Sequence, residues 1–201
     1  MEDESIQEGQ LGVFLLTCIT FFFAEIGDKT QLLSFALAAR YRKRSAIILA
    51  IFVATLVNHA LAGSLGVLIA HWLSPRATAL LVGVGFLAFG AWALVPDKLD
   101  EAPKTHGGVF MTTLIAFFIA EMGDKTQLAT IGLGARFASP VAVVLGTTIG
   151  MMIANVPAVF VGHELLKYVP LNIVRMIAAV LFLVIGLWVI AQTAGWTAGL
   201  I

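Results

Sequence analysis

The stretch FFFAEIGDKTQL at residues 21–32 places a glutamate, an aspartate and a lysine in the middle of a strongly apolar run. Residues 117–128 read FFIAEMGDKTQL, which is identical to the first stretch at ten of twelve positions. Charged residues are rare inside apolar segments because removing them from water is costly. The chain therefore carries the same unusual feature twice, and the spacing of the two copies determines how the molecule is organised.

The composition defines the class of protein. Hydrophobic residues make up 60% of the 201 residues and charged residues only 12%, and the mean hydropathy is +0.98. A soluble domain of this length carries about 25% charged residues. The sequence therefore predicts an all-α integral membrane protein. The single cysteine, Cys18, excludes an internal disulfide and a cysteine-based metal cluster.

Six apolar stretches are long enough to cross a hydrocarbon core, which takes about 20 helical residues. Their expected spans are 11–39, 46–71, 77–95, 107–135, 140–166 and 173–193. Backbone polar groups in lipid must be satisfied within the segment, so the spans are expected to be helices. The remaining parts are an acidic N-terminal tail (1–10), a polar cytoplasmic linker (96–106) and a C-terminal tail (194–201). An acidic start is unlike a signal peptide, so no cleavable targeting segment is expected.

The two halves of the chain are related by a constant offset. Glu121 lies 96 positions after Glu25, and the same offset maps residues 11–95 onto residues 107–191 of the second half (107–193) without a gap. Each half is expected to hold three spans. Because three is odd, the second half must enter the membrane from the opposite side. The sequence therefore predicts six transmembrane helices as two inverted three-helix repeats, related by a pseudo-twofold axis in the membrane plane.

Basic residues indicate the orientation, because they are enriched in cytoplasmic loops. One short loop holds Arg40, Arg42, Lys43 and Arg44. If this loop is cytoplasmic, the same side also receives Lys98, Lys104, Lys167 and Arg175. Only Arg76 and Arg136 then fall on the other side. Both termini are therefore predicted to be extracytoplasmic.

The two charged motifs are expected near the middle of the membrane. Glu25 and Glu121 each lie 14 residues after the start of their apolar span, which corresponds to about 21 Å of helix. A charge at this depth costs about 2.5–3.5 kcal/mol on insertion scales. The acids and lysines must therefore face one another, water or a bound ion. A purely structural ion-pair network would leave two of the four acids without a basic partner.

A divalent-cation site makes use of this excess of negative charge. On a continuous helix, Glu25 and Asp28 would share one face, and Gln31 would lie roughly on the same face. With their counterparts in the second half, the predicted metal ligands are Glu25, Asp28, Gln31, Glu121, Asp124 and Gln127. Hard cations such as Ca²⁺ and Mn²⁺ prefer carboxylate and amide oxygens. With both lysines charged the motifs carry a net charge of −2, which one dication would neutralise.

Other motif positions leave two interpretations open. Gly27 and Gly123 either open the helix at the site or allow a close helix crossing. Lys29 and Lys125 either hold the acids apart when the cation is absent or form structural pairs. Thr30 and Thr126 either cap local backbone or offer hydroxyl ligands.

Further polar residues are expected at the same depth in the second and fifth spans. Asn58 and His59 lie near the centre of 46–71, and Asn155 matches His59 in the repeat. A histidine at this depth either takes part in metal binding or proton transfer, or hydrogen-bonds a neighbouring helix. These three residues are therefore accessory candidates.

The motifs EIGDKTQL and EMGDKTQL, one in each half, resemble the duplicated E-x-G-D-[KR]-[TS] signature of uncharacterised protein family sixteen. This family belongs to the cation:calcium antiporter-2 superfamily and includes Golgi, thylakoid and bacterial members. The resemblance covers essentially the whole chain after residue 10. It implies export of Mn²⁺, and of Ca²⁺ as a further substrate, in exchange for protons. The family's acidic residues fall on Glu25, Asp28, Glu121 and Asp124. The chain lacks the long N-terminal region of organellar members, which suggests a bacterial plasma-membrane protein.

The expected mechanism is alternating access. Rocking of one half against the other would expose a midplane site first to the cytoplasm and then to the outside. Protons and cations would compete for the same carboxylates. No enzymatic activity, cofactor or nucleic-acid partner is expected, and the cation is the substrate. The alternatives are a divalent-cation channel or uniporter and, more remotely, an intramembrane aspartyl protease.

Overall fold

The structure is a computed structural model that describes residues 2–96, 107–137, 139–161 and 170–194, with side chains from residue 7 onward. Eight helices and no strands occur in these ranges. The helices are α1 (Glu2–Glu25), α2 (Lys29–Tyr41), α3 (Arg44–Trp72), α4 (Pro75–Ala93), α5 (Val109–Glu121), α6 (Lys125–Arg136), α7 (Pro140–Val161) and α8 (Leu171–Thr193). The all-α prediction is therefore confirmed. The linker and Lys98, Lys104 and Lys167 lie outside the described residues.

Two of the expected helices are broken. The span predicted at 11–39 divides into α1 and α2, and the span predicted at 107–135 divides into α5 and α6. Each break falls in the charged motif, at residues 26–28 and 122–124. The sequence left open whether the motif glycines open these helices, and the structure shows that they do, because each glycine adopts a left-handed conformation that ends the helix. The α1 helix also begins at Glu2, so most of the segment expected to be a tail continues this helix.

Five helices are long and apolar enough to cross a membrane: part of α1 (Gln7–Glu25), α3, α4, α7 and α8. The α5 helix is apolar but has only 13 residues, and α6 continues it after the break. The chain is thus a multi-pass membrane protein.

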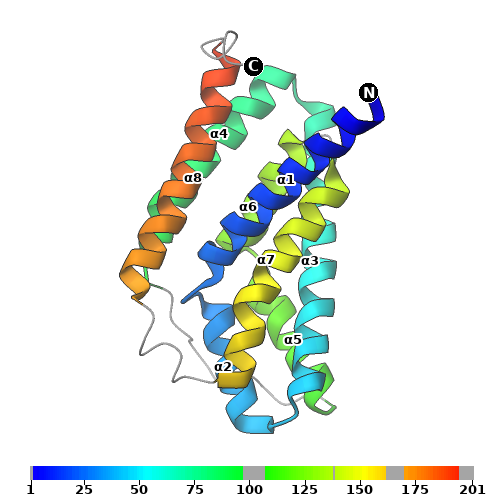
Figure 1. The fold of residues 1–201 in the computed structure, drawn as a ribbon, viewed down its shortest axis with the longest axis vertical. Helices are drawn as coiled ribbons and strands as arrows, with labels where there is room; N and C mark the ends of the chain where they lie inside the picture. Colours follow the sequence, from blue (N-terminus) through cyan, green and yellow to red (C-terminus); the bar gives the residue numbers. More distant parts are fainter. Residues whose placement is uncertain (1, 97–106, 138, 162–169, 195–201) are drawn as a thin grey trace.

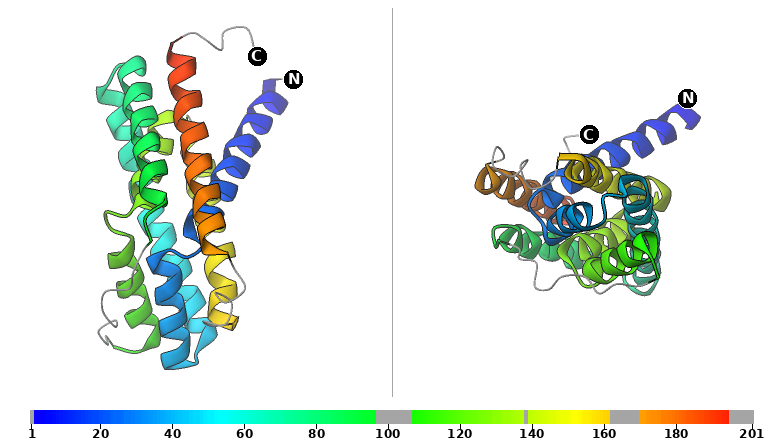
Figure 2. Two further views of the ribbon diagram at one scale, coloured as in Figure 1. Left: turned by 90° about the vertical axis from the view of Figure 1, so that its left-hand side faces the viewer. Right: turned by 90° about the horizontal axis from the view of Figure 1, so that it is seen from below.

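The two halves run in opposite directions. In Figure 1, α1 and α2 follow one another from the end that holds the N-terminus to the far end, and α3 returns. The α5 and α6 helices start at the far end and run the other way, and α7 comes back down. Both termini therefore lie at one end of the molecule (Figure 2), which is called the termini end below. This course agrees with the expected inversion of the second half.

The halves interleave rather than forming separate bodies. The α1 helix packs on α7 and the α6 helix on α3, while α4 packs on α8. Small residues permit these close crossings: a Cβ atom added to Gly150 would lie 2.3 Å from the carbonyl oxygen of Cys18, and one added to Gly134 would lie 2.5 Å from that of Gly63. Because each half is packed into the other, the expected rocking of two intact halves does not suit this arrangement.

The apolar core has two parts, and the charged motifs lie between them. One cluster joins α1, α4, α6 and α8 and includes Phe21, Phe86, Leu133 and Phe182. The other joins α2, α3, α5 and α7 and includes Leu37, Ile51, Phe117 and Val159.

The α4–α8 pair is placed asymmetrically. It packs on α6 and α1, which lie toward the termini end. Under the inverted repeat, the equivalent contacts would be α8 on α2 and α4 on α5, and these pairs are not packed in the described part of the chain. Figure 2 shows α4 and α8 side by side along the upper part of the molecule, whereas α2 and α5 lie at the far end. The two halves therefore share one topology, but the packing of the α4–α8 pair on its neighbours is not repeated.

Candidate functional site

Each motif breaks its helix in the same way. Gly27 and Gly123 have φ angles of +80° and +76°, which L side chains rarely adopt. Asp28 and Asp124 follow in extended conformation and cap the next helix, since each side chain accepts a hydrogen bond from the backbone N–H two residues later. The open interpretation of the motif glycines is thus decided in favour of opened backbone.

The motif glutamines secure the two breaks. Gln31 Oε1 accepts a hydrogen bond from the Gly27 N–H at 2.9 Å, and Gln127 Oε1 accepts one from the Gly123 N–H at 2.7 Å. Their amide nitrogens reach across to the other half, to the carbonyl oxygen of Ala154 at 3.0 Å and to Asn58 Oδ1 at 2.9 Å. Both amide oxygens thus bind motif backbone here, and the role of the glutamines as cation ligands stays a prediction.

The lysines join the two motifs. Lys29 Nζ lies 2.9 Å from Asp124 Oδ1, and Lys125 Nζ pairs with Asp28 Oδ1. Each lysine therefore pairs with the aspartate of the opposite half. The positive charges lie where the two motifs meet.

The two glutamates of the site are fully buried at the ends of the half-helices. Glu25 ends α1 and Glu121 ends α5, and both side chains are fully buried. Thr30 Oγ1 donates to Glu25 Oε1, and Thr126 Oγ1 donates to Glu121 Oε2 at 3.2 Å. The other carboxylate oxygen of each glutamate is buried and has no hydrogen-bond partner among the described residues. A buried oxygen of this kind is costly unless a proton or a cation reaches it.

The α7 helix contributes an asymmetric contact. Asn155 Nδ2 donates to Glu25 Oε1 at 2.8 Å, and Ser34 Oγ donates to Asn155 Oδ1 at 2.7 Å. Sequence reasoning missed Ser34. The signal that could have found it is the repeat, because the equivalent position holds another hydroxyl residue, Thr130.

His59 does not repeat the role of Asn155. Its ring contacts Phe21 edge to face at a centroid distance of 5.6 Å, and Nδ1 lies 3.5 Å from Thr148 Oγ1. No hydrogen bond to Glu121 is seen in the described part of the chain. Its neighbour Asn58 instead reaches the second motif through Gln127.

The site is closed tightly in this structure. A cavity of only about 10 Å³ lies beside Asp28 and Lys125, which is about the room that one water molecule needs. No group of three or more histidine, cysteine, aspartate or glutamate side chains in the described ranges is arranged to hold a metal ion. The expected six-oxygen ring is therefore not assembled here, because two lysine–aspartate pairs occupy the meeting point of the motifs.

These features define a class of protein. Half-helix ends that meet inside a multi-pass membrane protein, with buried acids and opened backbone, are typical of secondary transporters for ions. Comparison with known proteins gives the family: the chain belongs to the divalent cation/proton antiporter GDT1 family, whose profile matches residues 13–101 and again residues 109–197. The two matched segments are related by the same offset of 96 that relates the motifs. The chain is therefore a transporter and not an enzyme.

Relatives extend across bacteria and plants. A protein of Vibrio cholerae serotype O1 named "Putative manganese exporter" is 50% identical over 182 residues, which are 90% of this chain and 91% of the relative. GDT1-like protein 5 of Arabidopsis thaliana is 28% identical, over 83% of this chain and 90% of the relative. GDT1-like protein 3 of Oryza sativa subsp. indica is 26% identical, over 91% of this chain and 79% of the relative. No solved structure matches the chain.

Proposed function

We propose that the protein exports Mn²⁺, and also accepts Ca²⁺, in exchange for protons, at a site made by the two motifs. The observation that carries this proposal is the pair of buried carboxylate oxygens, Glu25 Oε2 and Glu121 Oε1, which have no partner among the described residues. They lie next to aspartates that are neutralised by lysines of the opposite half. The name of the Vibrio cholerae relative supports Mn²⁺ as the substrate.

Charge balance suggests how cation and proton exchange. The four acids and two lysines carry a net charge of −2 when all are ionised, so either one dication or two protons would neutralise the site. Two protons on Glu25 and Glu121 would satisfy the oxygens that lack partners. A dication would instead need several oxygens, which requires at least one lysine–aspartate pair to open. Each lysine thus acts as an internal counter-ion that the cation displaces.

Alternation of access is assigned to the α4–α8 pair in this proposal. The pair packs toward the termini end in the structure, and the inverted repeat provides an equivalent set of surfaces on α2 and α5. Movement of the pair between these surfaces would open the site to one side and then to the other. The orientation follows from the basic loop after α2: the termini end faces the outside of the plasma membrane.

Transport in proteoliposomes tests the proposal. Purified protein is given Mn²⁺ or Ca²⁺ on one side, with and without an imposed pH gradient, while cation uptake and internal pH are recorded. We expect saturable Mn²⁺ flux coupled to opposite proton flux, reduced at least 100-fold in Glu25→Gln and Glu121→Gln. Glu8→Gln is the matched control, because Glu8 is exposed near the start of α1.

Three outcomes would contradict the proposal. Full transport in either motif variant would exclude the site. Cation flux that ignores the pH gradient would replace the antiporter with a uniporter or channel. Strong flux of Ca²⁺ with no flux of Mn²⁺ would be compatible with the proposed site but would contradict Mn²⁺ as the substrate.

A further inference from the structure

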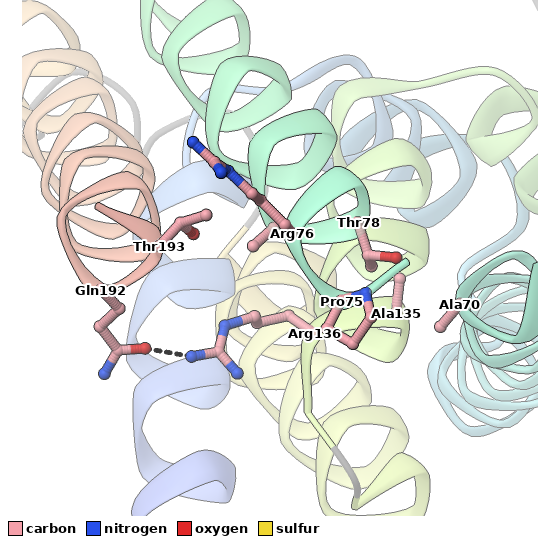
Figure 3. Close-up of a pocket in the computed structure, with 9 residues that line it drawn as sticks. Ala70, Pro75, Arg76, Thr78, Ala135, Arg136, Gln192 and Thr193 are labelled. Carbon is pink, nitrogen blue, oxygen red and sulfur yellow. Dashed lines mark hydrogen bonds between the residues drawn. The ribbon is translucent and has the colours of Figure 1, made fainter. Parts of the chain in front are cut away.

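A second polar site lies at the termini end, where α6 ends at Arg136, one helix length beyond the second motif. A pocket of about 580 Å³ opens between the ends of α3, α4, α6 and α8. Its polar lining residues are Arg76, Thr78, Arg136, Gln192 and Thr193. Figure 3 shows the side chains of Arg76 and Arg136 extending into the space beside α8. None of the residues that line the pocket is acidic.

The two arginines are the exceptions to the charge bias of the whole chain. The orientation predicted from the sequence assigns every other basic residue outside the two motifs to the side of the basic loop. Arg76 and Arg136 lie on the opposite side, and the fold brings both to one pocket. Neither has an acidic partner in the part of the chain that the structure describes. Two uncompensated positive charges in one pocket favour an anionic ligand.

Unpaired polar atoms point to the same ligand. Gln192 Oε1 accepts a hydrogen bond from Arg136, and the guanidinium lies 5.5 Å from the ring centroid of Trp188. The side chain is thus held in place, yet its Nε is buried without a hydrogen-bond partner in the described ranges. Thr78 is only 5% exposed, and its hydroxyl also lacks a partner there. Both atoms can donate a hydrogen bond to an oxygen anion.

The internal repeat shows that the pocket is not a by-product of duplication. At the equivalent positions of the other half, Asn172 replaces Arg76, Val174 replaces Thr78 and Pro96 replaces Gln192. Arg136 has an equivalent arginine, Arg40, but the combination of two arginines with Thr78 and Gln192 occurs at one end of the molecule only. A role common to both halves, such as forming the cation site, does not account for them.

The position of the pocket favours a phosphate at headgroup depth. Arg76 belongs to the first turn of α4 and Gln192 to the last turn of α8, and both helices are membrane spans. Trp72 near the pocket's α3 edge is 82% exposed, as is usual for tryptophans at membrane surfaces. The N-terminus of α4 adds the positive end of a helix dipole to the two arginines.

We propose that this pocket binds a phosphate group, carried by an anionic lipid headgroup or free in solution at the termini end. The guanidinium groups of Arg76 and Arg136 provide the charge, and Thr78 Oγ1 and Arg136 Nε donate hydrogen bonds to phosphate oxygens. A phosphate so bound would join α4 to α6, and therefore hold the α4–α8 pair in its present position. The proposal does not depend on which cation the motifs transport.

Native mass spectrometry tests the lipid source. The full-length protein is released from nanodiscs that contain equal amounts of phosphatidylglycerol and phosphatidylcholine, and the retained lipid is identified. We expect phosphatidylglycerol to be retained preferentially, and the retained fraction to fall about tenfold in Arg76→Gln/Arg136→Gln. Arg42→Gln/Lys43→Gln is the charge-matched control, because both residues are exposed in the loop after α2, at the other end of the molecule.

Radiolabelled inorganic phosphate tests the free source. Saturable binding to the detergent-purified protein, lost in Arg76→Gln/Arg136→Gln and kept in Arg42→Gln/Lys43→Gln, would assign the pocket to a free anion. Thr78→Val should weaken either ligand two- to fivefold while preserving the fold, since valine already occupies the equivalent position at Val174. The proposal is overturned if neither ligand binds, or if binding is unchanged in Arg76→Gln/Arg136→Gln.

Discussion

At the scale of single residues, the site contains two lysine–aspartate ion pairs. They occupy equivalent positions in the repeat, but their lysines differ in solvent exposure. The side chain of Lys125 is only 4% exposed in its pair with Asp28, whereas that of Lys29 is 29% exposed in its pair with Asp124. The same two residue types at the same motif positions therefore meet different surroundings. Removal of a positive charge should cost more where water cannot replace it.

The difference in lysine exposure predicts which lysine substitution lowers the stability of the protein more. Lys125→Met should remove the ion-pair partner of the buried Asp28 carboxylate, which costs about 3–5 kcal/mol. Lys29→Met should cost clearly less, because its pair is nearer the surface. Thermal unfolding of both variants in the same detergent measures the difference, and each serves as the control for the other.

A second substitution separates charge from packing. Asp28→Asn in the Lys125→Met background removes the negative charge of the Asp28 carboxylate. Much of the stability lost in Lys125→Met should therefore return. If the double variant is no more stable than Lys125→Met, or if Lys29→Met is the more damaging single change, the ion pairs do not stabilise the site as argued.

The residue types of the site could be read from the sequence, but their pairing could not. Four acids and two lysines at the same depth in two inverted halves had to meet, and they do. The prediction that Glu25 and Asp28 share one helix face is wrong, since the two residues lie on either side of a break. Which lysine reaches which aspartate depends on the direction of the chain after that break.

At the scale of helices, the two motif glycines set the geometry of the site. Both have positive φ angles, but their surroundings differ. A Cβ atom added to Gly123 would meet no atom within 4 Å, whereas one added to Gly27 would lie 2.9 Å from Leu171 Cδ2. Substitutions at Gly123 and Gly27 therefore distinguish the effect of backbone strain alone from that of backbone strain with a steric contact.

Alanine substitutions should show these two effects separately. Gly123→Ala should cost about 1–2 kcal/mol, which is the cost of the left-handed conformation for an L residue. Gly27→Ala should cost more, because Leu171 must also move. Thermal unfolding measures both, and Gly12→Ala is the control, since nothing lies within 4 Å of that added Cβ.

Relief of the contact gives the decisive comparison. In a Leu171→Ala protein, Gly27→Ala should lower the free energy of unfolding by about as much as Gly123→Ala does in the unmodified protein. Each loss is measured against the protein that lacks the glycine substitution. Equal effects of the two single substitutions would mean that the start of α8 does not press on the first break.

The sequence offered the two breaks only as one of two interpretations of the motif glycines. An apolar run such as 11–39 has the length of one span, and a single glycine in it is equally typical of a close helix crossing. Other glycines of this chain, including Gly134 and Gly150, do serve crossings. The residue after each motif glycine distinguishes the cases, because an aspartate that caps a new helix requires a helix start.

At the scale of the whole molecule, the inverted topology follows from an odd number of spans in each half, and the structure agrees with it. The packing asymmetry does not follow from the sequence. Two nearly identical motifs give no reason for the α4–α8 pair to lie at one end rather than the other. If the α4–α8 pair moves as proposed, the equivalent surfaces on α2 and α5 would receive it in a second arrangement, and the structure presents the first.

Phe86 and Gly132 mark the contact that this arrangement uses. A Cβ atom added to Gly132 would lie 3.0 Å from Phe86 Cε2, where α4 packs on α6. The repeat equivalents of these residues are Phe182 and Ala36. Phe86 and Phe182 contact each other edge to face at 5.8 Å, so both phenylalanines lie at the centre of the α4–α8 pair. Movement of the pair to the other end would bring Phe182 to Ala36.

Cysteine pairs can detect both arrangements. In a Cys18→Ser background, Phe86→Cys/Gly132→Cys should react readily with a short bifunctional thiol reagent, and the cross-link should stop transport. Ala36→Cys/Phe182→Cys should cross-link only in molecules that have passed to the other arrangement, so its yield should change when a Mn²⁺ or pH gradient is imposed. The four single-cysteine variants measure how much activity the substitutions alone remove. If the second pair never cross-links while transport continues, the α4–α8 pair stays at the termini end, and the site must open by another motion.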